Sequence, residues 1–179
     1  MKELSLHILD IIENSLSARA DTISIQILED GNQDIFEISI EDNGMGMDAK
    51  TVEKVIDPFT TSRSTRKVGL GIPLFKASAE ACNGDFQITS KKGIGTKIKV
   101  SFQNSHIDRM PLGEIGDTIH SLLITSPEIT WIFSYSKNNS EFSFNSSEIN
   151  KHLGEVSITD PLVIRFLREF ISDGINSLC

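Results

Sequence analysis

The hydrophobic period of the chain changes abruptly at Thr22, and this change constrains the fold more than any other feature. Residues 3–18 carry apolar side chains at helical spacing, which predicts an amphipathic helix. From Thr22 onward isoleucines alternate with polar residues, as is typical of a half-buried strand. Alternation resumes at 36–40 after the turn-forming residues 30–33, so the helix is followed by a β-hairpin.

Further helices and strands follow, with a change of composition near residue 104. We expect Asp48 to cap a short helix that ends before Pro58, and Ser146 and Asp160 to cap two later helices. The other expected elements are a polar loop at 60–68, a helix with Pro73 in its first turn that ends at 83–84, strands at 85–90 and 96–102, a helix at 113–124, a hairpin at 130–136 and 141–145, and helices at 146–153 and 161–177.

Composition excludes several classes of protein. The net charge of −8 argues against broad nucleic-acid binding, which needs clustered Lys and Arg. No apolar run is long enough to span a bilayer, and the first residues lack the features of a signal peptide. Cys82 and Cys179 lie far apart without metal-ligand spacing, so we expect a cytoplasmic protein without a disulfide framework or membrane partner.

Asp10 and Asn14 stand at i and i+4 among apolar positions and therefore share one face of the first helix. An inward-pointing carboxylate and carboxamide are costly unless they have partners. An Asn carbonyl can complete a Mg²⁺ shell that is shared with phosphate oxygens, and a carboxylate one turn away could deprotonate a water molecule. The alternative is that Asn14 caps or packs while Asp10 is solvated.

The motif Asp42-x-Gly44-x-Gly46 ends the second expected strand. Its glycines permit positive φ and let the backbone approach a flat ligand closely. A carboxylate there can accept from an exocyclic amine such as that of adenine, and Met45 and Met47 offer adaptable apolar walls. A simple turn remains the alternative.

Gly69-Leu70-Gly71 precedes a helix, where free backbone N–H groups and the helix dipole suit an anion. Arg63, Arg66 and Lys67 in the preceding loop could reach a terminal phosphate. The alternative is an ordinary turn at a helix start. The segment matches neither the P-loop nor the Rossmann motif.

Taken in order, Asn14, the Asp42 motif, Pro58-Phe59, residues 69–71 and Gly93-x-Gly95-Thr96 resemble the GHKL (Bergerat-fold) ATPases. This superfamily includes histidine kinases, mismatch-repair ATPases and anti-sigma-factor kinases, and the resemblance covers about residues 4–103. It implies an α/β two-layer sandwich, with a mixed, mostly antiparallel sheet and helices on one face. We expect a histidine-kinase-like ATP-binding domain at 1–106 and a small α+β C-terminal extension at 107–179.

The resemblance also implies roles for single residues. Asn14 would be the Mg²⁺ ligand, Asp10 the general base and Asp42 the acceptor for the adenine amine, with residues 60–68 forming the ATP lid. Two departures are that Asp10 is one methylene shorter than the usual Glu, and that Lys67 replaces the first glycine of the phosphate motif. The residues expected to contact the nucleotide are Asn14, Ala18, Asp42, Gly44, Gly46, Met47, Phe59, Thr60, Arg66, Lys67, Gly69, Leu70, Gly71 and Thr96.

These features predict a protein that binds ATP with Mg²⁺. Three hypotheses stay open: slow ATP hydrolysis, phosphoryl transfer to an unidentified protein partner, and a catalytically weak, ATP-gated subunit of a larger complex, for instance a redox enzyme. At most a dozen residues precede the Asn14 motif, so we expect no self-phosphorylation of the histidine-kinase type. The extension either packs on the ATPase core or forms a docking module, and the superfamily leaves a homodimer open.

Overall fold

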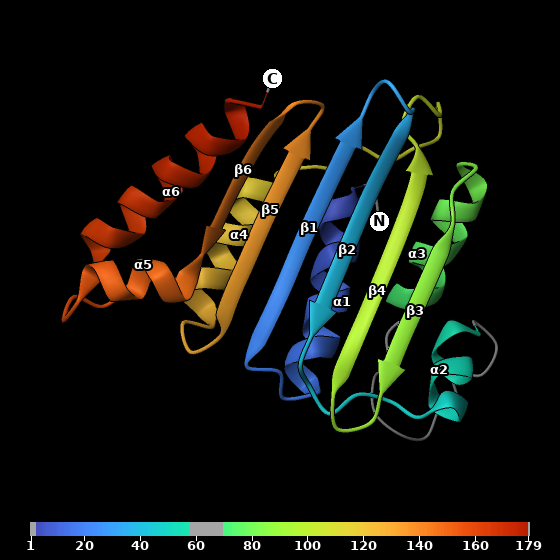
Figure 1. Cartoon of the computed structure of the whole chain (residues 1–179), viewed down its shortest axis with the longest axis horizontal. Coiled ribbons are helices and arrows are strands. Elements are labelled where there is room, and N and C mark those ends of the chain that lie inside the picture. The colour runs from blue at the N-terminus through green and yellow to red at the C-terminus, as the bar shows by residue number, and fades with distance from the viewer. Residues whose placement is uncertain (1–2, 58–69, 179) are drawn as a thin grey trace.

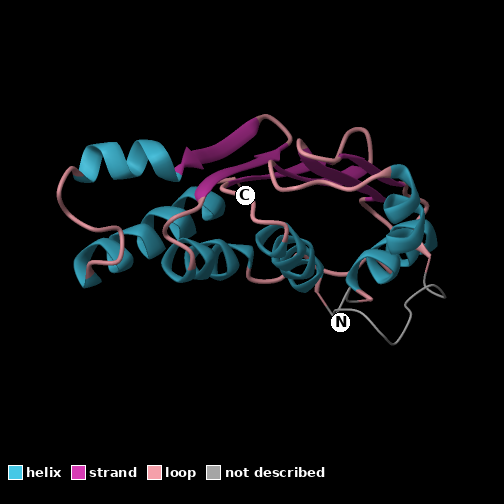
Figure 2. Cartoon of the chain, turned by 90° about the horizontal axis from the view of Figure 1, so that it is seen from below, coloured by secondary structure: helices cyan, strands magenta, loops and turns pink. Residues whose placement is uncertain are grey.

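Six strands form one mixed sheet in the computed structural model, which describes residues 3–57 and 70–178. Their order is β3-β4-β2-β1-β5-β6 (Figure 1). Figure 2 shows most of the helices on one side of this sheet, as in the two-layer sandwich expected from the sequence. The elements are α1 (Leu4–Ser17), β1 (Thr22–Asp30), β2 (Ile35–Asp42), α2 (Ala49–Ile56), α3 (Gly71–Ala81), β3 (Phe86–Lys91), β4 (Gly95–Gln103), α4 (Ile115–Thr125), β5 (Thr130–Lys137), β6 (Ser140–Asn145), α5 (Ser146–Leu153) and α6 (Pro161–Asn176).

All neighbouring strands run antiparallel except β1 and β5, which pair in parallel along their whole length from Thr22↔Thr130 to Glu29↔Lys137. The chain passes from β4 to β5 through α4, across β2 and β1, which lie between these two strands in the sheet. The C-terminal segment therefore packs against the N-terminal part of the chain by adding β5 and β6 to the same sheet. The domain division at 106/107 stays a prediction.

The two faces of the sheet differ in chemistry, which explains the alternation in the sequence. On the open face Lys97 pairs with Glu41 at 2.9 Å and Lys99 pairs with Glu37 at 3.0 Å, across β4 and β2. The opposite residues point toward the helices and form the core. The isoleucines of β1 and β2 that are buried there are Ile23, Ile25, Ile27, Ile38 and Ile40.

Two of the three predicted helix caps are confirmed. Asp48 and Asp160 each accept a hydrogen bond from a backbone N–H in the first turn of α2 and α6. The prediction that Ser146 caps α5 is wrong, because Asn145 is the cap. Ser146 is instead buried, and its Oγ accepts a 2.8 Å hydrogen bond from the backbone N–H of Trp131. Tertiary burial therefore shifts the cap by one residue.

His7 of α1 packs against α3. It is 3% exposed, and its ring stacks on Phe75 with centroids 4.9 Å apart and an interplanar angle of 8°. Within the described residues its Nδ1 is buried without a hydrogen-bond partner. Burial lowers the pKa of His7, because the imidazolium ion loses solvation there. The folded protein therefore holds His7 neutral at a pH where the unfolded chain would protonate it.

We expect this burial to make the protein less stable in mild acid. Below the ordinary histidine pKa of about 6.5, the unfolded chain binds a proton that the folded chain resists, so the free energy of unfolding falls with pH. His7→Phe keeps the stacking but removes the titration. Its melting temperature should fall less than that of the wild type between about pH 7 and pH 5, whereas His152→Phe, at an exposed site on α5, should leave the fall unchanged. Equal falls in all three proteins would contradict this role.

No helix in the described part of the chain combines the length and the apolar character that crossing a membrane requires.

Candidate functional site

A pocket of about 230 Å³ is lined by residues of α1 and α2 and by the helix-facing side of β2 and β4. Its walls come from α1, the end of β2, the loop that follows, α2, the start of α3 and β4. The lining is mostly apolar, with a few polar groups among the aliphatic side chains. The residues that line it are Ile11, Asn14, Ser15, Ser17, Ala18, Ile40, Asp42, Met45, Gly46, Met47, Thr51, Val55, Ile72, Thr96 and Ile98.

Asp42 is the carboxylate of this pocket, and both of its oxygens are held. Oδ2 accepts a 2.6 Å hydrogen bond from Ser15 Oγ, and Oδ1 accepts a 2.9 Å hydrogen bond from the backbone N–H of Gly44. A carboxylate with two donors keeps further lone pairs for a third partner. Asp42 therefore offers a pre-oriented acceptor in a mostly apolar cavity.

Ser15 was not predicted as a site residue. It is 2% exposed, and its hydroxyl reaches from α1 to the end of β2. The available signal was a small polar side chain on the apolar side of an amphipathic helix, next to Asn14. Such a residue needs a polar partner when it is buried. The partner was the motif residue Asp42, 27 positions later in the sequence.

The glycines of the Asp42 motif let the following loop pass close to two other segments. A Cβ at Gly44 would lie 2.8 Å from the backbone oxygen of Ala18 in the turn after α1. Gly46 has a φ of +62°, and a Cβ there would lie 2.0 Å from the backbone oxygen of Lys91. The loop also donates a 2.9 Å hydrogen bond from Met45 N to the Ala18 oxygen. Glycine is therefore required at both positions to bring Met45 and Met47 over the pocket.

Thr96 closes the pocket on the β4 side. It lies opposite Asp42 in the β2–β4 register. Its Oγ1 is 2.9 Å from Ser90 Oγ, and Ser90 Oγ also accepts a 2.8 Å hydrogen bond from the backbone N–H of Met47. Ser90 therefore links the loop that carries Met45 and Met47 to β4, the strand that carries Thr96.

Asp10 and Asn14 occupy different places, although they share a helix face. Asn14 lines the pocket, whereas Asp10 lies one turn away at the N-terminus of α3. A Cβ at Gly71 would lie 2.9 Å from Asp10 Oδ2, so the glycine allows this close approach. Leu70, at the N-cap position of α3, provides no side-chain hydrogen bond to the first turn. The start of α3 thus presents a positive dipole end beside Asp10.

The pocket brings together part of the predicted site. Six predicted residues line it, Gly44 adjoins it, and Leu70 and Gly71 lie at the start of α3. The contact of any of them with a nucleotide stays a prediction. Beyond Ser15, sequence reasoning also missed Thr51 and Val55, which stand four residues apart on α2. The predicted residues Phe59, Thr60, Arg66, Lys67 and Gly69, and the expected lid at 60–68, lie outside the described residues.

Residues 2–106 match the family described as histidine kinase-, DNA gyrase B-, and HSP90-like ATPase. This match spans more than half of the chain, so the protein belongs to the GHKL ATPase family. The resemblance drawn from the motifs is confirmed.

Two histidine kinases illustrate the relationship. The chain is 37% identical over 97 residues to the signal transduction histidine-protein kinase AtoS of Escherichia coli. The aligned region covers 53% of this chain and 15% of AtoS. It is also 37% identical over 98 residues to the sensor histidine kinase WalK of Bacillus subtilis. This aligned region covers 50% of this chain and 16% of WalK. The matched part is therefore a small fraction of each kinase.

A solved structure supports the fold beyond the family match. The ATPase domain of Aquifex aeolicus MutL, complexed with ADP, superposes with a TM-score of 0.52 at 15% sequence identity, covering 86% of this chain and 68% of that domain. At this level of identity the similarity shows the fold alone. It confirms the α/β architecture of the GHKL ATPases for this chain.

Proposed function

We propose that this protein binds Mg²⁺-ATP in the pocket and promotes slow hydrolysis of ATP, or transfer of its terminal phosphate to a partner protein. The observation that carries the proposal is the carboxylate of Asp42, fixed by Ser15 and by the Gly44 backbone within an apolar cavity. Membership of the GHKL family and the fold shared with an ADP-bound MutL domain support the same nucleotide.

The shape and polarity of the pocket suit adenine. Apolar walls that include Met47 and Ile98 suit the faces of a flat base. The Asp42 carboxylate accepts a hydrogen bond from the exocyclic amine of adenine but repels the oxygen that guanine carries at the same position. A site built around one such hydrogen bond discriminates strongly against a base that lacks the donor. We therefore expect ATP to bind in preference to GTP.

The phosphates then extend from the pocket toward the start of α3. Backbone N–H groups at Gly71 and beyond face anions that approach this helix end. The Asn14 carboxamide oxygen would hold Mg²⁺, which supplies charge neutralisation for the phosphates when bound. Asp10 lies beside Gly71, where its carboxylate would take the proton of the attacking water or of a partner's hydroxyl group.

One observation favours a second candidate function, that of an ATP-gated binding subunit with negligible turnover. The side chain of Asp10 is one methylene shorter than that of Glu, which would set its carboxylate back from the attacking water. A base set back from the attacking water would act slowly. Binding of ATP would then be the functional event, and an unidentified protein partner would bind differently to the ATP-bound and the ATP-free protein.

Asn14→Ala tests the Mg²⁺ ligand. It should lower the affinity for ATP in the presence of Mg²⁺ by about tenfold or more, because it removes one oxygen ligand to a charged centre. Affinity measured in excess chelator should hardly change, because Asp42 and the apolar walls remain. Isothermal titration calorimetry with and without Mg²⁺ makes the comparison.

Asn32→Ala, in an exposed turn at the other end of the sheet, is the matched control and should behave like the wild type. Persistent tight, Mg²⁺-dependent binding by Asn14→Ala would refute the ligand assignment. Absence of ATP binding by the wild type, or equal binding of GTP, would refute the proposed function.

A further inference from the structure

Helix α6 has a wide apolar face, of which one side is buried against the protein and the other is exposed to solvent. Val163, Leu167 and Ile171 are buried on its inner side. Three further apolar residues follow the helix at spacing i, i+4 and i+8 and so form a second row. We call this row the α6 stripe; it consists of Leu162, Phe166 and Phe170, which are 70%, 62% and 37% exposed. Large apolar side chains gathered in one exposed row mark an interaction surface.

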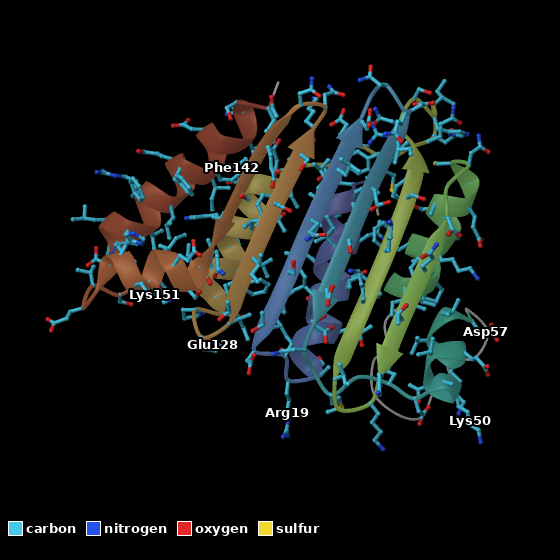
Figure 3. The ribbon with its side chains drawn as sticks, in the orientation of Figure 1. Arg19, Lys50, Asp57, Glu128, Phe142 and Lys151 are labelled. Carbon is cyan, nitrogen blue, oxygen red and sulfur yellow. The ribbon has the colours of Figure 1, made fainter. Side chains whose placement is uncertain are left out.

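The α6 stripe is rigidly supported by the sheet edge. The rings of Phe166 and Phe170 stack with centroids 6.2 Å apart, and Phe170 packs edge-on against Phe142 of β6 at 5.4 Å. Figure 3 shows Phe142 beside α6. A Cβ at Gly174 would lie 2.2 Å from Phe142 Cε2, so this glycine within the helix permits the close packing. The two phenylalanine side chains of the stripe are therefore already ordered by packing in the free protein, which lowers the entropy cost of binding.

We propose that the α6 stripe is the contact surface of a symmetric dimer, in which α6 packs antiparallel to α6 of a second copy. A two-fold axis near Phe166 would place each Phe166 against its equivalent. The same axis would place Leu162 of each copy against Phe170 of the other, because residue i meets j and j meets i across such an axis. A row of three apolar residues centred on an aromatic one is self-complementary in this arrangement.

The charges beside the α6 stripe favour a second copy over an unrelated partner. Arg165 and Glu169 are exposed and stand one residue before and three residues after Phe166 on the same flank. In an antiparallel pair with this axis, Arg165 of each copy comes within one helical turn of Glu169 of the other on the same flank. Arg168 points elsewhere, because its Nη2 lies 3.2 Å from Oδ1 of Asp117 on α4.

Sedimentation velocity across a concentration series tests the surface. The full chain should show a dimer that dissociates on dilution, and Phe166→Glu should be monomeric with an unchanged circular dichroism spectrum. Ile107→Glu, at an apolar residue that is 93% exposed outside the stripe, is the matched control and should dimerise like the wild type. A wild type that stays monomeric at about 100 µM, far above the Kd of a specific interface, would overturn the proposal. Loss of the dimer in Ile107→Glu would do the same.

A charge exchange tests the orientation. Arg165→Glu and Glu169→Arg should each weaken the dimer by about tenfold or more, because symmetry turns two attractive contacts into two repulsive ones. An equimolar mixture of the two variants should dimerise again, because each Arg then meets a Glu across the axis. A mixture no more dimeric than its separate components would overturn the antiparallel arrangement. This test does not depend on nucleotide binding, so it stands or falls separately from the proposed function.

Discussion

Asp42→Ala is expected to weaken ATP binding by roughly 100-fold, because it removes the only charged acceptor that lines the described pocket. The loss has two parts. The exocyclic amine of adenine loses its acceptor in a cavity that excludes water. The backbone N–H of Gly44 also loses its partner, and the hydroxyl of Ser15 keeps only the longer 3.3 Å contact with the Ile11 carbonyl oxygen.

Ser15→Ala separates these two parts. It keeps the carboxylate but frees Oδ2 from its 2.6 Å hydrogen bond, so it should weaken ATP binding by a smaller factor, about three- to tenfold. Ser15 is thus a positioning residue, and its effect should be larger for ATP than for GTP, since only adenine uses the oriented oxygen.

Calorimetric titration of ATP and GTP measures both variants, with melting temperatures to confirm that they remain folded. Asp85→Ala is the matched control, because Asp85 is exposed just before β3 and lies beside Ser101, at the end of β3 opposite to Ser90 and Thr96. If Asp42→Ala bound ATP as tightly as the wild type, the pocket would not be the adenine site.

Local chemistry made much of this fold predictable. The switch from helical to alternating periodicity at Thr22 located α1, β1 and β2, because burial on one face leaves a period in the sequence. The caps Asp48 and Asp160 were predictable because each acts on a backbone N–H two or three residues away. These signals are short-range, and they remain readable without the rest of the molecule.

The features that sequence reasoning missed depend on contacts between distant segments. Nothing in residues 130–137 indicates that they pair in parallel with β1, about a hundred positions earlier. Ser146 has a side chain that suits a helix cap, but its hydroxyl oxygen accepts a hydrogen bond from the backbone N–H of Trp131 instead. Ser15 belongs to the site only because α1 lies against the end of β2. In each case a tertiary hydrogen bond decides between options that are locally equivalent.

The same distinction applies to Asp10 and Asn14. Their spacing placed them on one helix face, and the structure agrees, but the spacing could not show that one lines the pocket while the other meets the start of α3. Under the proposed function, Asn14 would hold Mg²⁺ at the edge of the pocket and Asp10 would act beside the start of α3. This is why the two residues are expected to affect different measurements, Asn14 the affinity in the presence of Mg²⁺ and Asp10 the rate.

Asp10→Asn is expected to lower the release of phosphate from ATP by about 10²–10⁴-fold, the usual contribution of a general base. Asparagine has the same shape but cannot take a proton from water, while ATP affinity should change by less than about threefold, because Asp10 does not line the pocket. Incubation with γ-labelled ATP and Mg²⁺ follows the label in free phosphate, in protein and in intact ATP.

Glu13→Gln is the matched control, because Glu13 is an exposed carboxylate on the same helix, three residues further along. Release of free phosphate by the wild type and by Glu13→Gln, but not by Asp10→Asn, would establish hydrolysis with Asp10 as the base. Equal release by all three proteins would contradict that role. If ATP bound to the wild type but stayed intact, the short side chain of Asp10 would explain the result, and the ATP-gated binding subunit would become the favoured function. Phosphoryl transfer would then be tested by adding a protein acceptor, where Asp10→Asn should again abolish the label that the wild type transfers.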